Sequence, residues 1–233
     1  MRFAALFGKE FRECLPWMLL AAIVLLAFGG FFLRAQAYDT NPNREWSRGY
    51  CAPGTLVEPY RLTFNSPLAL LGPWLFCCSI GLGLILGVRQ FWIPHFTRTW
   101  PFLLHRSVRR STVLAAKLTA ASVAIVLATG GVWVVLFWYA CRPEVFGVPQ
   151  PVRIFIEGWI FIVLGLVAYL GTALSGLSEA RWYTTKIFGI AFAAIIIFIT
   201  TMEWSMAWAL AVIAFSTALL LSQLFDTFAT REF

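Results

Sequence analysis

Charged residues are scarce in this chain of 233 residues, in which Lys, Arg, Asp and Glu together make up 12%. A soluble domain carries roughly 25% charged residues and about 45–50% apolar ones. Here 60% of the residues are hydrophobic and 17% are aromatic. This composition argues against an ordinary soluble fold and indicates a chain that spans a lipid bilayer.

Side chains that bind metals or act as catalytic bases are also few. The two histidines, His95 and His105, lie in one basic segment, and neither belongs to an HExxH pattern. The five cysteines show no metal-ligand spacing, and the sequence has no Walker A motif. We therefore predict that the chain is not an enzyme and holds no metal or cofactor of its own.

The net charge of +7 does not predict a nucleic-acid partner. A nucleic-acid binder gathers its basic residues on a soluble face, whereas here they lie in short gaps between apolar runs. No cleavable signal peptide is predicted, because the first apolar run follows a charged stretch and is not followed by a small-x-small cleavage site. That run is interpreted as a permanent span.

Six apolar runs are long enough to suggest membrane spans, and none shows the alternation of a membrane β-barrel. We predict one all-α transmembrane domain over residues 1–233, with spans at 17–33, 67–88, 118–140, 154–177, 187–202 and 205–225. The last two runs are separated by Glu203 and Trp204 alone, which predicts a helical hairpin.

Lys and Arg set the expected orientation, because cytoplasmic loops are enriched in them. With a cytoplasmic N-terminus, twelve Lys and Arg residues fall inside and six outside. Both termini and the basic segment 89–117 are therefore predicted to be cytoplasmic, and the polar loop 34–66 to be external.

Residues 1–16 have an amphipathic pattern. Phe3, Phe7 and Phe11 recur at every fourth residue with charged residues between them, and Pro16 follows. This predicts a separate interfacial helix that ends in a bend at Pro16. The alternative is that these residues form the start of the first span.

Three further features each allow a functional and a structural interpretation. Cys51 and Cys141 both fall outside and could form a disulfide, or could remain unpaired thiols. Glu157 lies in an apolar run, where an ionisable group suggests a functional site, but it could instead pair with Arg153 at the interface. The stretch GLGLILG (81–87) resembles a dinucleotide loop, but its GxxxG spacing favours close helix packing.

The segment 89–117 combines charge with aromatic residues. A loop that only sets topology needs few charges, whereas this one also carries Phe91, Trp92, Phe96, Trp100 and Phe102. We interpret it as a docking surface for a cytoplasmic partner or for lipid.

The basic segment resembles the corresponding loop of ABC transporter permeases of the type-2 exporter family. The resemblance rests on Thr99-x-x-Phe102-Leu103-Leu104, then Arg106-Ser107-Val108-Arg109-Arg110, then Lys117, and on FGKEFRE (7–13), which is similar to the N-terminal "elbow" helix of that family. These motifs lie within residues 7–13 and 99–117, and the six predicted spans with cytoplasmic ends also fit.

The resemblance implies a permease subunit in the bacterial inner membrane. Thr99, Phe102, Leu103 and Leu104 would form a coupling helix in a groove of a separate ATPase subunit, which would bind ATP and Mg. Arg106, Arg109 and Arg110 would meet acidic groups of that subunit, and a second permease half would complete a homodimer or heterodimer. The competing hypotheses are a non-transporting scaffold or regulatory subunit, and a secondary transporter that uses Glu157.

Overall fold

The computed structural model describes residues 2–39, 68, 71–97, 110–142, 150–178, 187–202 and 205–230. Within this part of the chain the structure is helical and has no strands. Apolar runs that span a bilayer must satisfy their backbone hydrogen bonds internally, and a helix does so. The predicted all-α class is therefore confirmed.

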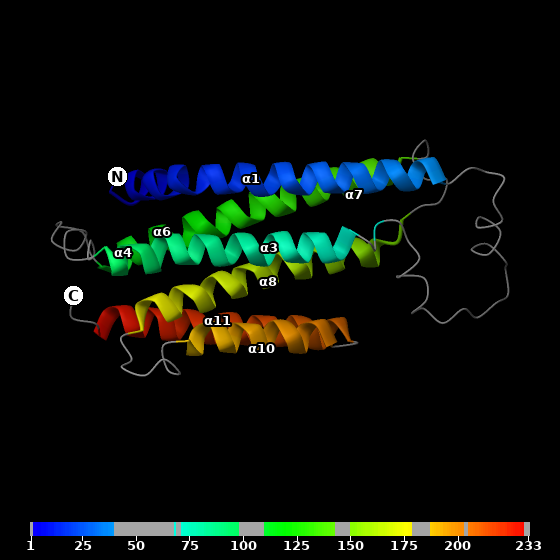
Figure 1. Cartoon of the computed structure of the whole chain (residues 1–233). Helices are drawn as coiled ribbons and strands as arrows, with labels where there is room; N and C mark the ends of the chain where they lie inside the picture. The colour runs from blue at the N-terminus through cyan, green and yellow to red at the C-terminus, as the bar shows by residue number, and fades with distance from the viewer. Residues whose placement is uncertain are drawn as a thin grey trace.

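The helices form an elongated bundle in which the chain runs back and forth (Figure 1). The long elements are α1 (Arg2–Asp39), α3 (Leu71–Gly87), α6 (Arg110–Ile125), α7 (Gly131–Ala140), α8 (Val152–Leu177), α10 (Phe188–Met202) and α11 (Met206–Thr230). The described part of the chain also has two π-helical segments. The first, η2 (Val88–Trp92), joins α3 to the short α4 (Ile93–Phe96), and the second, η3 (Val126–Gly130), joins α6 to α7.

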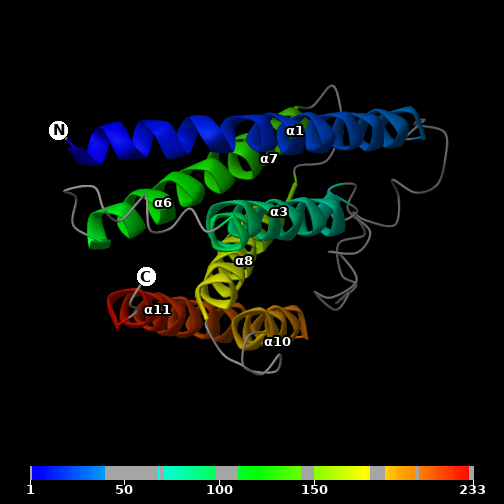
Figure 2. The same ribbon diagram turned by 60° about the vertical axis from the view of Figure 1, so that its left-hand side comes forward.

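Helix α8 forms the centre of the bundle. It packs on α3 on one side and on α10 and α11 on the other, while α1 packs against α6 and α3 (Figures 1 and 2). From Ile162 to Leu177 nearly all of its side chains are buried. The main core therefore lies along α8 rather than along the outer helices.

Glycines allow α3 and α8 to approach closely. A Cβ atom at Gly83 would collide with the backbone of Gly165, and one at Gly87 would collide with the side chain of Thr172. The packing interpretation of the GLGLILG stretch is thus confirmed, because backbones can approach closely where small residues line the contact.

Five helices are long and apolar enough to cross a membrane in the described part of the chain. They are Phe3–Ala35, Leu71–Trp92, Ser111–Ala140, Val152–Leu177 and Met206–Thr230. The predicted fifth span corresponds to α10, which has 15 residues, fewer than the roughly 20 that a perpendicular span needs. It packs against α11 as the predicted hairpin requires.

The predicted boundary at Pro16 is not found, because α1 continues through it from Arg2 to Asp39. The alternative, in which residues 1–16 begin the first helix, describes the structure. Tertiary packing explains the difference: Glu10 and Cys14 are buried within the bundle. Phe3, Phe7 and Phe11 stack along the side of the same helix.

Candidate functional site

Most residues of the predicted coupling loop lie outside the described part of the chain. These are Thr99, Phe102, Leu103, Leu104, Arg106 and Arg109. Arg110 is described as the first residue of α6. The helices that flank residues 98–109 are α4 and α6.

The helices that flank residues 98–109 have their ends at the same end of the bundle as the two chain termini. Helix α4 ends and α6 begins near the start of α1 and the end of α11 (Figure 1). The segment that carries the densest positive charge thus connects two helices at the same end as both termini.

A buried ion pair lies close to this end. The Nζ of Lys117 on α6 is 2.9 Å from Oε1 of Glu10 on α1 and donates a hydrogen bond of 3.0 Å to its Oε2. The two side chains are 5% and 7% exposed. A buried charge is costly unless it is paired and hydrogen-bonded, so each residue fixes the position of the other.

Hydrogen bonds extend this pair into a larger buried polar cluster, which we define as Glu10, Cys14, Gln90, Lys117 and Tyr169. The hydroxyl of Tyr169 on α8 donates to Oε1 of Gln90 at 2.6 Å and lies 3.4 Å from the backbone oxygen of Lys117. Nε2 of Gln90 donates to Sγ of Cys14 at 3.4 Å. The cluster therefore joins α1, η2, α6 and α8.

The π-helical segment η2 directs three successive residues toward α8. Gln90 meets Tyr169, the ring of Phe91 lies 6.2 Å from that of Tyr169, and Nε1 of Trp92 donates to the backbone oxygen of Thr172 at 3.0 Å. A π-helix has more residues per turn than an α-helix, so successive side chains diverge less around the axis. Such segments are frequent at functional sites.

The cluster is a hydrogen-bonded network whose members come from four helical segments. Its groups hold one another in hydrogen bonds across four helices, and polar networks in a low-dielectric interior are strong only when their members stay satisfied. No group of three or more His, Cys, Asp or Glu side chains able to hold a metal ion occurs among the described residues.

The other predicted site residues lie away from this cluster. Glu157 forms an ion pair with Arg153 at 2.9 Å, with 35% and 48% of the respective side chains exposed, as the interfacial interpretation predicts. Cys141 is an exposed free thiol just after α7, and Cys51 lies outside the described residues, so the disulfide between them stays a prediction without support from the structure. Cys77 and Cys78 are both free thiols.

Sequence reasoning included Glu10 and Lys117 only as members of the motifs that carry the family resemblance, and it did not predict that they meet in a buried cluster. It did not identify Cys14, Gln90 or Tyr169 as site residues. The pairing of Glu10 with Lys117 follows from helix starts that only the structure provides. Glu10 is eight residues past the start of α1, and Lys117 is seven past the start of α6, so both lie roughly 11 Å along helices that start at the same end. Opposite charges at equal depth in neighbouring spans favour pairing.

Comparisons of the chain with models of protein families, with curated proteins and with solved structures find no match.

Proposed function

We propose that this chain is the transmembrane permease subunit of an ABC transporter in a bacterial inner membrane. In this proposal, both termini and the basic segment are cytoplasmic. The observation that carries the proposal is that one buried polar cluster includes residues from both helical arms flanking residues 98–109. Lys117 lies on the α6 side and Gln90 on the η2 side.

This arrangement gives the basic segment a mechanical connection to the bundle. On one side, Trp92 and Gln90 hold η2 against α8. On the other side, Lys117 holds α6 against α1. Energetic coupling between distant sites is carried by packed side chains and hydrogen-bond networks. A force on residues 98–109 would therefore reach α1 and α8 together.

The energy source in this proposal is a separate ATPase subunit that binds ATP and Mg. The chain has no Walker A motif, so the nucleotide would bind in the partner. Thr99, Phe102, Leu103 and Leu104 would contact that partner, and Arg106, Arg109 and Arg110 would pair with its acidic groups. A second permease half, identical or different, would complete the pathway.

The ion pair of Glu157 bears on the competing transporter hypothesis. A carboxylate that couples proton or substrate movement lies at membrane depth and faces a pathway. Glu157 instead lies one turn or so into α8, is partly exposed, and pairs with Arg153 on the same helix. This geometry favours an interfacial role for Glu157 and leaves the ATPase-coupled permease as the better proposal.

The proposal is tested by charge reversal in the basic segment. We expect an ATPase to copurify with tagged wild-type protein from membranes of the source organism. The R109E/R110E variant should lose this ATPase, because it changes the charge at the contact by four units and its glutamates would repel the acidic groups of the partner. ATP hydrolysis by the purified material should fall as the ATPase is lost. The readouts are identification of copurified chains by mass spectrometry and phosphate release.

The matched control is R142E/R153E, which changes the charge equally on residues that follow α7 and begin α8. This variant should keep the ATPase. Should no ATPase copurify with the wild type, or should R109E/R110E retain it in full, the proposed docking role would be wrong and a scaffold without a motor would be favoured.

A further inference from the structure

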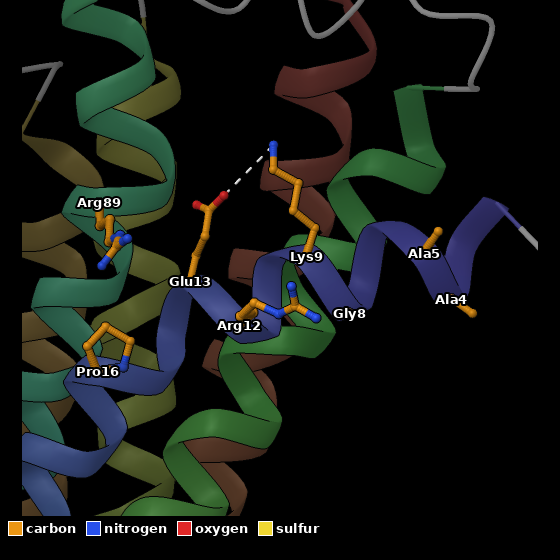
Figure 3. Close-up of a pocket in the computed structure, with 8 residues that line it drawn as sticks. All are labelled: Ala4, Ala5, Gly8, Lys9, Arg12, Glu13, Pro16 and Arg89. Atoms are coloured by element: carbon orange, nitrogen blue, oxygen red, sulfur yellow. Dashed lines mark ion pairs between the residues drawn. The ribbon is translucent and has the colours of Figure 1, made fainter.

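A charged groove opens on the surface between the start of α1 and the π-helical segment η2 (Figure 3). Its volume is about 580 Å³, within the range of roughly 300–1,000 Å³ typical of small-molecule pockets. Lys9, Arg12 and Glu13 line it from α1, and Arg89 lines it from η2. Gly8 leaves room between the charged side chains, because a Cβ atom there would meet nothing within 4 Å.

Two of the three cations in this groove lack a compensating carboxylate. Lys9 pairs with Glu13 at 3.8 Å across an exposed turn of α1. Arg12 and Arg89 have no ion-pair partner among the described residues. Arg89 is half-buried and belongs to the apolar helix Leu71–Trp92. A cation at the end of such a helix is stabilised by an anion at the interface.

An apolar stripe continues from the groove along the same face of α1. Pro16, Leu19, Ile23 and Leu26 follow Arg12 at intervals of three or four residues, which places them on one side of a helix. Leu19, Ile23 and Leu26 are 54%, 62% and 44% exposed. A soluble anion would use only the charged groove, whereas a phospholipid would use the groove and the stripe together.

We propose that this groove binds the headgroup of an anionic phospholipid, with Arg12 and Arg89 on the phosphate and an acyl chain along the α1 stripe. Basic pockets between membrane helices bind anionic headgroups in this way, and arginine suits phosphate because its planar guanidinium offers several donors in a fixed geometry. The site does not depend on an ATPase partner.

The test is native mass spectrometry of the detergent-solubilised full chain titrated with dioleoylphosphatidylglycerol or dioleoylphosphatidylcholine. Wild-type protein should bind the anionic lipid more tightly than the zwitterionic one. R12Q/R89Q should weaken anionic-lipid binding about 25-fold, since each basic residue near an anionic surface contributes about fivefold. R142Q/R153Q, which removes two arginines from the other end of the bundle, should bind like the wild type.

Two further measurements keep the proposal falsifiable. Added NaCl should weaken binding of phosphatidylglycerol to the wild type, because exposed charges are screened; binding that ignores salt would overturn the proposal without any variant. Glycerophosphoglycerol, the same headgroup without acyl chains, should compete poorly. Competition by glycerophosphoglycerol as strong as that by the whole lipid would show a site for soluble anions and would also overturn the proposal. An R12Q/R89Q variant with unchanged helicity and unchanged lipid affinity would overturn it as well.

Discussion

The Glu10–Lys117 pair shows that the burial of an ion pair determines how much it contributes to stability. Lys9 and Glu13 form an exposed pair on the same helix, with 56% and 46% of their side chains exposed, while Glu10 and Lys117 are almost fully buried. An exposed pair contributes about 0.2–1 kcal/mol, whereas removal of one member of a buried pair costs roughly 3–5 kcal/mol. Adjacent residues of α1 therefore differ greatly in importance.

We predict that K117M and E10Q each destabilise the protein by roughly 3–5 kcal/mol, because each leaves an uncompensated buried charge. The double variant E10Q/K117M should lose less than the sum of the two. The measurement is the unfolding free energy in mixed micelles of detergent and denaturing surfactant. The matched controls K9M and E13Q remove the exposed pair and should change stability by no more than about 1 kcal/mol. Strictly additive losses at Glu10 and Lys117 would contradict the coupling.

At the scale of helices, small residues determine how closely α3 and α8 pack. Gly81 and Gly83 are two positions apart on α3, yet a Cβ atom at Gly81 meets nothing within 4 Å and one at Gly83 collides with the backbone at Gly165. Backbone cannot move aside as the end of a flexible side chain can. The two glycines thus have different structural roles in one helix.

We predict that G83A lowers the unfolding free energy by about 1–3 kcal/mol, the usual cost of overpacking a well-packed contact. G81A should leave it unchanged or raise it by up to about 1 kcal/mol, because alanine favours the helix more than glycine does. Thermal unfolding followed by circular dichroism distinguishes the two variants. Equal effects of both substitutions would mean that α3 and α8 are not in backbone contact here.

At the scale of the whole molecule, the back-and-forth path of the chain determines which helix ends lie at the same end of the bundle (Figure 1). The start of α1, the end of α11 and the helix ends beside residues 98–109 are at the same end of the bundle, with α1 and α11 on opposite sides of it (Figure 1). The helix formed by α6, η3 and α7 starts next to residues 98–109, and Cys141 follows its opposite end. Because cytoplasmic loops are enriched in Lys and Arg, the basic end is expected inside and Cys141 outside.

We therefore predict opposite accessibility for two single-cysteine variants, one retaining Cys141 and one carrying K9C, with the other cysteines changed to serine. A membrane-impermeant maleimide should label position 141 in intact cells and position 9 only after the membrane is permeabilised. Both positions are exposed in the folded chain, so burial does not explain a difference. Labelling of position 9 from outside would contradict the orientation and remove the basic segment from the reach of a cytoplasmic ATPase.

Much of the architecture was predictable because it depends on local pattern. The apolar runs marked the helices to within several residues at most ends, and the GxxxG spacing marked Gly83 and Gly87 as a contact. The i,i+4 spacing likewise marked Arg153 as the partner of Glu157. Each of these depends on residues close in sequence or on a requirement that lipid places on every spanning helix.

The length of α1 was not predictable in the same way. Proline after an amphipathic stretch usually marks a boundary, but Glu10 and Cys14 on that stretch are buried against neighbouring helices, and packing kept the helix continuous through Pro16. The π-helical register of η2, which turns Gln90 toward Tyr169, also depends on contacts with α8 that no local pattern encodes.

The sequence by itself therefore determined a membrane-type helical chain, the approximate place of each helix, and the gathering of cations between the second and third spans. Only the tertiary structure decided which charges are buried and which remain exposed. The physical reason is that the cost of a charge depends on the solvent and partners around it. Those partners are supplied by helices more than a hundred residues away, as Lys117 is for Glu10.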